Sequence, residues 1–452
     1  MKSRAFSPSG EKVPKADEGA LQASIIGTIR SLRSSFLIAI AALAIFSSCS
    51  TRREGRERLE LWGLGREGEV VADMIPEFER RNPGIQVVVQ QIPWTAAHEK
   101  LLTAYMGDST PDVAQMGNTW IPEFVAMKAL DDLGPFVGKG GIERNDYFPG
   151  IWATNVVDKT LYGIPWYVDT RVLFYRTDIL ASVGFPKGPA TWSEWTEAMK
   201  RIHDRHKSKW GILFPTNEWE PIVNLALTNG STILTEDGTR GAFRQPAFAT
   251  AFAFYVEAFR KGYAPAVSNT QIANLYQQFA QGDFAMYISG PWNVGEFRRR
   301  MPASMQDKWS TAPLPARDAS QTTGISMAGG SSLVVFRASQ HKQAAQKLIE
   351  FLSDPERQVK FYQVTGDLPA RRSAWRSRAL TQEPHFAAFH EQLENVVPLP
   401  KVPEWEQIAT AIFDRGEAAA RGATTQKQAL ADLDRKADQL LEKRRWMMTN
   451  KR

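Results

Sequence analysis

The chain has 452 residues, 43% hydrophobic and 23% charged, which is typical of a globular protein with about two domains. The net charge is +6, and the charges are scattered, so nothing indicates a nucleic-acid partner. A single cysteine excludes an intramolecular disulfide, so packing must stabilise the fold.

Residues 1–48 have the layout of a secretory signal with a long polar preface. Arg30 and Arg33 precede an apolar run, then small residues, then the only cysteine, Cys49. The run is shorter than the ~20 apolar residues that cross a bilayer. A translation start downstream of Met1 would explain the preface.

The stretch FSSC, which ends at Cys49, resembles the lipobox of bacterial lipoproteins, with Phe46 where leucine is usual. The resemblance implies that the Cys49 thiol is lipidated and becomes the mature N-terminus. Each buried methylene of such a lipid adds ~0.8 kcal/mol to membrane binding. The polar residues 49–58 are then a tether. The alternative is a buried cysteine at the end of a membrane anchor.

After the tether, short strands alternate with amphipathic helices. The alternation predicts α/β lobes with mostly parallel sheets. In chain order we expect a strand at 59–62, a helix at 69–83, a strand at 85–92, a helix at 96–107, a strand at 112–116, a strand at 331–336, a helix at 341–354 and a C-terminal helix within 427–445.

Gly63, Gly65 and Gly68 form a GxGxxG motif between the first strand and the first helix, which is the local context of a dinucleotide fingerprint. The second strand ends in VVVQQI, without the acid that a ribose hydroxyl needs. We therefore favour a glycine-rich turn whose free backbone N–H groups face an open cleft and serve a polar ligand.

Five stretches, in order, resemble the family 1 extracellular solute-binding proteins of carbohydrate ABC importers. The first pairs NPGIQVVVQQI with GDSTPDVAQMGNTWIPEF, and the second pairs LYGIPWYVDTRVLFYRTDIL with PATWSEWTEAMKRI. The third, FAQGDFAMYISGPWNVGEF, is close to the group's G-x-x-A-M-x-x-x-G-x-W pattern. The fourth runs from APLPARD through MAGGSSLVVFRAS to TGDLPARRSAW, and the fifth is GATTQKQALADLDRKADQLL. Together they span Leu59 to Leu441.

The resemblance implies a type II periplasmic-binding-protein fold, in which two α/β lobes with mostly parallel sheets flanked by helices are joined by about three crossings. Lobe one would comprise residues 59–166 and 327–376, and lobe two residues 170–322 and 380–452. The crossings would lie near 166–171, near 324–329 and after Arg371. A ligand binds between the lobes and closes them, and the transporter senses this hinge motion.

The expected ligand is a sugar or small oligosaccharide, because its C–H faces pack on aromatic rings and its hydroxyls bond to carboxylates, amides and arginine. The chain has 14 tryptophans, many beside polar groups. The ligand-binding residues that we expect are Trp62, Gly65, Asn118, Trp120, Tyr167, Asp169, Arg171, Trp219, Glu220, Trp292, Asn293, Gly329, Gly330, Arg371 and Trp405.

Each of these residues has a structural alternative. A tryptophan often simply packs in a core. Asp169 and Arg171 can form a hinge salt bridge, the paired glycines can serve only the second hinge, and Arg371 can be a solvated surface residue. We expect a purely structural role for Trp192 and Trp195, on a helix capped by Thr191 or Ser193, and for Trp210, Trp309 and Trp375.

The motifs of common enzymes are missing: the sequence contains no HExxH, GxSxG or P-loop. The pair His203 and His206 lies on a basic helix, which is typical of a solvated face rather than a metal site. We expect no enzymatic activity, no cofactor and no metal. The alternative enzyme is an exported glycan-cleaving hydrolase, with Asp112, Asp169 and Glu220 as its candidate carboxylates.

We interpret the chain as a monomeric sugar-binding subunit that delivers its ligand to an inner-membrane ABC permease. A lipid on Cys49 would hold it to the membrane, in the periplasm or at the cell surface. Two further alternatives are a subunit that feeds a sensor instead of an importer, and a phosphorylated polyol or another small polar solute as the ligand.

Overall fold

The computed structural model describes residues 55–138 and 141–449. The predicted signal, the lipidation site at Cys49 and most of the tether lie outside the described residues. Residues 56–452 cluster as one unit, and its first strand begins at Glu57.

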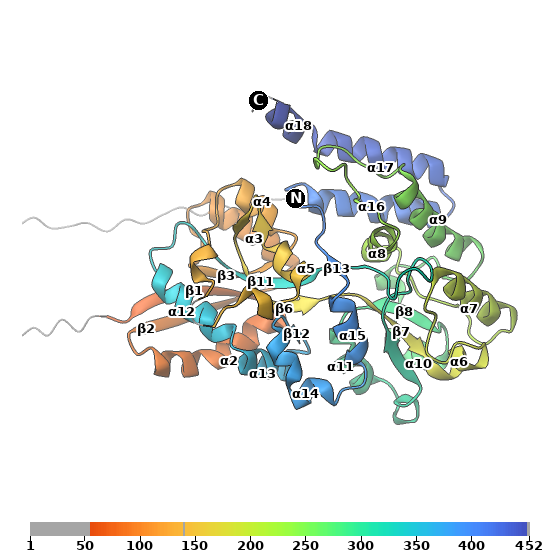
Figure 1. Ribbon diagram of the computed structural model, residues 1–452, viewed down its shortest axis with the longest axis horizontal. Helices are drawn as coiled ribbons and strands as arrows, with labels where there is room; N and C mark the ends of the chain where they lie inside the picture. Colours follow the sequence, from red (N-terminus) through yellow and green to blue (C-terminus); the bar gives the residue numbers. More distant parts are fainter. Residues whose placement is uncertain (1–54, 139–140, 450–452) are drawn as a thin grey trace, which may run out of the picture. The chain divides into compact units, whose positions relative to one another are not determined.

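A six-stranded sheet organises the first lobe (Figure 1). The helices α2 (Gly65–Arg81) and α3 (Trp94–Met106) connect its parallel strands β1, β2 and β3, as a parallel crossover requires. The strand order is β12 (Leu368–Pro369), β6 (Ile164–Asp169), β11 (Gly329–Val335), β3 (Val113–Gly117), β1 (Glu57–Leu64) and β2 (Ile85–Ile92).

The expectation of mostly parallel sheets is wrong for the pairing of the remaining strands, although the two-lobed α/β fold itself is confirmed. β11 pairs antiparallel with both β3 and β6, and β12 pairs antiparallel with β6. The physical reason lies in the route of the chain. β6 carries the chain out of this lobe and β11 brings it back, so Asp169 and Gly329 are direct partners on neighbouring, opposed strands.

The second lobe is built on a three-stranded antiparallel sheet in the order β8–β7–β9. Its strands are β7 (Val172–Arg176), β8 (Met286–Ser289) and β9 (Trp309–Ala312). Residues 210–213 run parallel to β8 through two isolated bridges, Trp210 to Phe284 and Leu213 to Tyr287. Parallel pairing is therefore present in this lobe, but it is local.

Helices surround both sheets. The longer ones are α7 (Trp192–Asp204), α8 (Glu220–Thr228), α9 (Pro246–Arg260), α11 (Trp292–Arg300), α12 (Lys342–Leu352), α13 (Pro355–Thr365), α15 (Phe386–Leu393), α16 (Trp405–Ala420), α17 (Gln426–Leu440) and α18 (Glu442–Thr449). The shorter elements are α4 (Ile121–Ala126), α5 (Pro149–Thr154), α6 (Thr177–Ser182), α10 (Leu275–Gln281), α14 (Arg378–Thr381) and the strands β4 (Val156–Val157), β5 (Thr160–Leu161), β10 (Ser326–Met327) and β13 (Val396–Val397). The predicted C-terminal helix is thus two helices, which break at Leu441.

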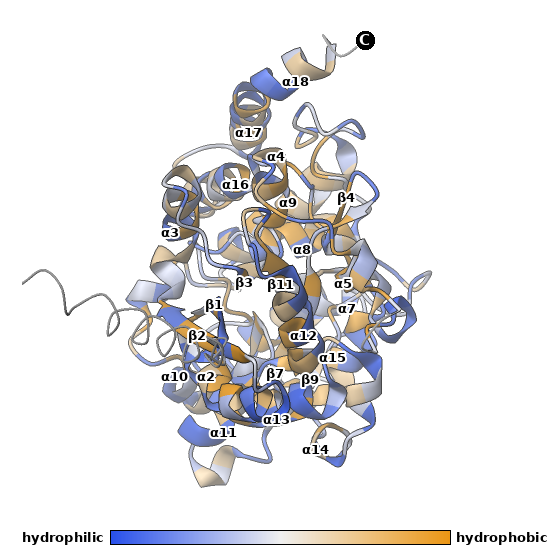
Figure 2. Cartoon of the chain, turned by 90° about the vertical axis from the view of Figure 1, so that its left-hand side faces the viewer, coloured by the Kyte–Doolittle hydropathy of each residue, from blue (hydrophilic) through white to orange (hydrophobic). Residues whose placement is uncertain are grey.

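The structural role predicted for Trp192 and Trp195 is confirmed. The Thr191 hydroxyl caps α7 by accepting a hydrogen bond from the backbone N–H of Glu194 (3.3 Å). Both indoles are buried and pack against Phe254: the ring centroids of Trp192 and Trp195 lie 4.8 and 5.4 Å from that of Phe254. Hydrophilic colouring predominates on α11 and α13 in Figure 2, which agrees with three exposed arginines at the end of α11 and with the exposed Glu356, Lys360 and Gln363 on α13.

A buried ion pair fixes the edge of the first lobe where the chain follows β12. The Arg371 guanidinium is buried and donates to Asp146 Oδ2 (2.6 Å) and to the Ser353 carbonyl (3.1 Å). Asp146 also accepts from the N–H and the hydroxyl of Ser373 (2.8 and 2.6 Å). Burial opposes ionisation of Asp146, but the hydrogen bonds from Ser373 and Arg371 outweigh it and lower the pKa of its carboxyl.

We expect Asp146→Ala to lower the free energy of unfolding by about 3 kcal/mol, because it leaves the buried Arg371 without its counter-charge. The lowered pKa means that this contribution is complete above the pKa of an unfolded aspartate and is lost as the pH falls through the folded-state value. Urea unfolding at pH 7 and at stepwise lower pH measures both effects. Asp73→Ala on the exposed face of α2 is the control and should change stability by less than about 0.5 kcal/mol. Equal effects of the two substitutions would contradict the assignment.

Candidate functional site

A cavity of about 560 Å³ lies between elements of the two lobes. The first lobe contributes the turn after β1, the loop after β3 and the end of β6, and the second contributes the first residues of α8 and α11. Ligands of open α/β folds bind at such strand ends. We call this cavity the cleft.

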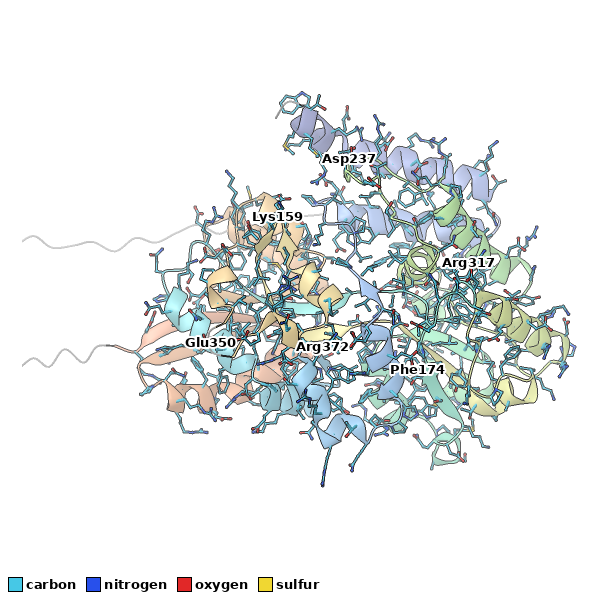
Figure 3. All side chains as sticks on the ribbon, viewed as in Figure 1. Lys159, Phe174, Asp237, Arg317, Glu350 and Arg372 are labelled. Carbon is cyan, nitrogen blue, oxygen red and sulfur yellow. The ribbon has the colours of Figure 1, made fainter. Side chains whose placement is uncertain are left out.

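A second hollow of about 640 Å³ is larger but chemically different. Lys159 and Asp237, labelled in Figure 3, lie on its wall, and residues 397–402 also line it. No aromatic side chain lines this hollow, whereas four tryptophans and a tyrosine line the cleft. The cleft is therefore the candidate functional site.

The structure brings ten of the predicted site residues to the wall of the cleft. They are Asn118, Trp120, Tyr167, Asp169, Arg171, Trp219, Glu220, Trp292, Gly329 and Gly330.

Trp292 presents its ring to the cleft because of the turn that precedes it. Its indole lies over Gly290, where a Cβ atom would overlap the ring, so the ring position requires glycine there. Pro291 then starts α11 with Trp292 as its first helical residue. The side chain is 38% exposed, which is unusual for an indole and leaves its surface open to a ligand.

Arg171 joins the two lobes beside this ring. Its Nη1 donates to both carboxylate oxygens of Asp169 (2.6 Å each), and its Nη2 donates to Glu220 Oε1 (2.8 Å). The guanidinium carbon lies 4.8 Å from the centre of the Trp292 ring, which is a cation–π arrangement. Asp169 and Glu220 raise the pKa of Arg171 against the effect of its burial, so the arginine stays charged. The salt bridge that is the structural alternative for Asp169 and Arg171 is therefore present, and both residues also line the cleft.

The opposite wall carries a second aromatic group on the first lobe. Trp94 begins α3 and meets Trp120 edge to face, with ring centroids 5.7 Å apart. His98, one turn further along α3, lies under Trp120 at 5.0 Å and shares a hydrogen bond with Glu123 (2.7 Å). This bond raises the pKa of His98 despite partial burial.

Two carboxyl groups flank Tyr167 at the floor of the cleft. The Tyr167 hydroxyl donates to Glu67 Oε1 (3.1 Å) and accepts from Gln115 Nε2 (3.2 Å). The Trp94 indole N–H also donates to Glu67 (3.2 Å). Burial, and then the charge of Glu67, raises the pKa of the neighbouring Asp367 to about 8. These polar groups can exchange hydrogen bonds with hydroxyls of a ligand.

Five predicted residues do not line the cleft. Trp62 belongs to the first-lobe core, Asn293 is held by the Tyr276 hydroxyl and Ser289, and Arg371 is engaged by Asp146. Trp405 is 1% exposed and packs edge-on against Trp219, 5.5 Å away. The rings of Trp62 and Trp405 are both buried in hydrophobic cores, so a ligand in the cleft does not reach them.

Gly65 is the fifth predicted residue that does not line the cleft, but it packs behind Trp94, which does. It has φ +51°, and a Cβ there would lie 2.5 Å from Trp94, so the bare backbone makes room for that indole. Gly63 and Gly68 pack the strand against the helix, because a Cβ on Gly63 would lie 2.6 Å from the Gly68 Cα. The glycine motif thus serves close packing and brings Glu67 to the cleft.

Sequence reasoning missed several lining residues. They are Arg66, Glu67, Trp94, Gly117, Thr119, Pro291, Met327, Thr365 and Asp367. Trp94 had a usable signal, because it directly follows the second strand just as Trp292 follows β8. Asp367 had none, because only the fold brings the α13–β12 turn to Tyr167.

In the part of the chain that the structure describes, no group of three or more His, Cys, Asp or Glu side chains could hold a metal ion. Over the same residues, the helices are too short or too polar to cross a membrane.

Comparisons with known proteins identify the family. The model of the bacterial extracellular solute-binding proteins matches residues 63–359. The sugar-binding protein MalE from Xanthomonas citri is a similar solved structure, 45% identical, with a TM-score of 0.83 over 87% of this chain and 99% of that chain. A solute-binding protein of an ABC transporter from Thermotoga lettingae, solved with α-D-tagatose, is 25% identical, with a TM-score of 0.71 over 85% of this chain and 100% of that chain. The galactooligosaccharide-binding protein of Bacillus subtilis is 27% identical over 85% of this chain and 89% of its own length. The chain belongs to the family of bacterial extracellular solute-binding proteins.

Proposed function

We propose that this protein is the extracytoplasmic sugar-binding subunit of an ABC importer. It captures a sugar or small oligosaccharide between its lobes and hands it to a permease in the membrane. The observation that carries the proposal is a cleft in which aromatic rings from both lobes lie beside the carboxyl side chains of the wall and an arginine. The names of the sugar-binding relatives support the same class of ligand.

The chemistry of the cleft suits an uncharged polyhydroxy ligand. Trp292 on one lobe and Trp94 on the other expose 38% and 36% of their surface, so each offers a flat apolar face to the C–H groups of a sugar ring. Carboxylate oxygens around Tyr167 accept hydrogen bonds from hydroxyls. The volume of about 560 Å³ lies in the range of small-molecule sites.

Capture by closure follows from the way the lobes are connected. The chain leaves the first lobe at Asp169 and returns at Gly329, and these residues pair side by side. Few residues therefore need to change conformation for one lobe to rotate against the other. We propose the lobe boundaries 59–166 with 327–376, and 170–322 with 380–452.

We further propose that a lipid on Cys49 holds the protein, as a monomer, at the outer side of a membrane, with residues 49–58 as the tether. The lipobox-like stretch before Cys49 supports this step. Mass spectrometry of the N-terminal peptide from membranes of the producing cell tests it, because lipidation adds acyl mass to Cys49.

We expect Trp292→Ala to weaken sugar binding about 10- to 100-fold, because a buried aromatic face contributes ~1.5–3 kcal/mol and 1.4 kcal/mol is a factor of ten. Fluorescence and calorimetric titration with a panel of sugars measures the effect. Trp446→Ala, which removes an indole that is 67% exposed on α18, is the matched control and should bind like the parent. An unchanged affinity in Trp292→Ala would remove this ring from the site.

Arg171 is expected to act through Trp292 as well as through its charge. Arg171→Met should weaken sugar binding by about tenfold or more, because the ring loses its cation–π support and two acids lose their counter-charge. Arg171→Lys should fall between parent and Met variant, since lysine keeps the charge but not the planar stack. Arg317→Met is the control. Arg317, labelled in Figure 3, is not among the residues that line the cleft, and its guanidinium lies 4.9 Å from the centre of the Trp192 ring. Parent-like titrations of both Arg171 variants would contradict the role.

The alternative of a glycan-cleaving hydrolase has one supporting observation, because four carboxyl groups line the cleft and paired carboxylates also cleave glycosidic bonds. We expect end-labelled malto- and galactooligosaccharides to keep their length during long incubation with the protein, as measured by chromatography. Time-dependent shortening that disappears in Glu220→Gln would establish the hydrolase.

A further inference from the structure

Acidic side chains outnumber basic ones in the wall of the cleft, and this excess decides which class of sugar fits the proposed function. Two arginines and four acids line the wall, namely Arg66, Arg171, Glu67, Asp169, Glu220 and Asp367. The question is which of these charges a ligand would meet.

Both arginines already have an acidic partner. Arg171 already donates to Asp169 and Glu220, so its charge is more than matched within the wall. Arg66 lines the cleft at an exposed position and pairs with Glu69 on its own helix (3.0 Å).

The acids Glu67 and Asp367 have no cation among their hydrogen-bond partners. Glu67 accepts only neutral donors, the Tyr167 hydroxyl and the Trp94 indole. Asp367 faces the charges of Glu67 on α2 and Asp169 on β6 and is bonded by Thr365 of its own turn. Burial, and then repulsion from the charge of Glu67, raises the pKa of Asp367 to about 8.

More acid groups lie behind the wall of the second lobe. Burial, and then the charge of Glu220, raises the pKa of Glu218 to about 7, and burial raises the pKa of Glu406. Because their pKa values are raised, both groups add negative potential to the cleft only as the pH rises and they ionise.

We propose that the cleft selects carbohydrates without negative charge and rejects uronic acids and sugar phosphates, through the acid pair Glu67 and Asp367. A neutral sugar offers hydroxyl donors to the pair, and an amino sugar offers an ammonium group. A carboxylate or phosphate on the ligand meets the charge of Glu67, and above a pH of about 8 it also meets the charge of Asp367. Among the lining cations, Arg171 is paired with Asp169 and Glu220, and Arg66 is paired with Glu69. The inference rests on the proposed function and narrows its substrate class.

The test compares matched sugars that differ only in charge: glucose, glucuronate and glucosamine, and the corresponding galactose set, with maltose and its glucuronyl counterpart. Calorimetry at low salt should give at least about tenfold weaker binding of each uronate than of the neutral member of its set. In the double variant Glu67→Gln with Asp367→Asn, the ratio of the Kd for the uronate to the Kd for the neutral sugar should fall to about threefold or less. The control double variant Asp73→Asn with Glu99→Gln neutralises two exposed acids, which equals the change of net charge in the cleft variant at pH 9, where Asp367 is ionised, and it should keep the parent ratio.

Raising the pH from 6 to 9 should increase the ratio in the parent, because Asp367 then loses its proton while the uronate stays ionised. A uronate that binds as tightly as its neutral counterpart, or a ratio unchanged in the cleft double variant, would overturn the inference but leave sugar binding intact. If no member of any set binds, the proposed function fails and the inference fails with it. Thermal melts of each variant establish that it is folded.

Discussion

The cleft depends on one buried cation, Arg171. Its guanidinium contacts Asp169 at the end of β6, Glu220 at the first turn of α8 and the ring of Trp292 at the start of α11. Three elements from both sides of the first crossing are thus set relative to one another by one side chain. Removing a buried cation from such a group costs several kcal/mol because the remaining acids are left without compensation. The arginine therefore sets both the geometry of the wall and its charge balance.

The close pairing of β11 with β6 explains why two glycines, Gly329 and Gly330, line the cleft at the crossing. Gly330 has φ +119°, and a Cβ there would collide with the backbone of β6 next to Tyr167. Only glycine lets β11 lie this close to β6 at the point where both strands enter the hinge. On the same strand β6, the Tyr167 hydroxyl donates to Glu67 Oε1 (3.1 Å), which connects β6 to the first turn of α2.

The elements of the fold could be predicted from the sequence better than their pairing. Hydrophobic period and glycine or proline signals locate β2 and α3 closely, because both signals are local. Whether β11 runs with or against β3 depends on the path of the chain through the other lobe, which no local pattern contains. The site divides in the same way: Trp292 follows a glycine–proline turn that marks a strand end, whereas Asp367 reaches Tyr167 only through tertiary packing.

The dipeptide Trp405–Glu406 shows why residue type alone misassigns a site. Trp405 is the first residue of α16, and its buried ring holds Trp219, which does line the cleft. Glu406 lies about 100° further round the helix and accepts a hydrogen bond from Thr119 of the first lobe (2.6 Å). The aromatic residue thus supports the wall from behind, and its acidic neighbour bridges the lobes. The direction in which a helix starts, which is set by packing of α16 on α9 and α17, decides which of two adjacent side chains meets the other lobe.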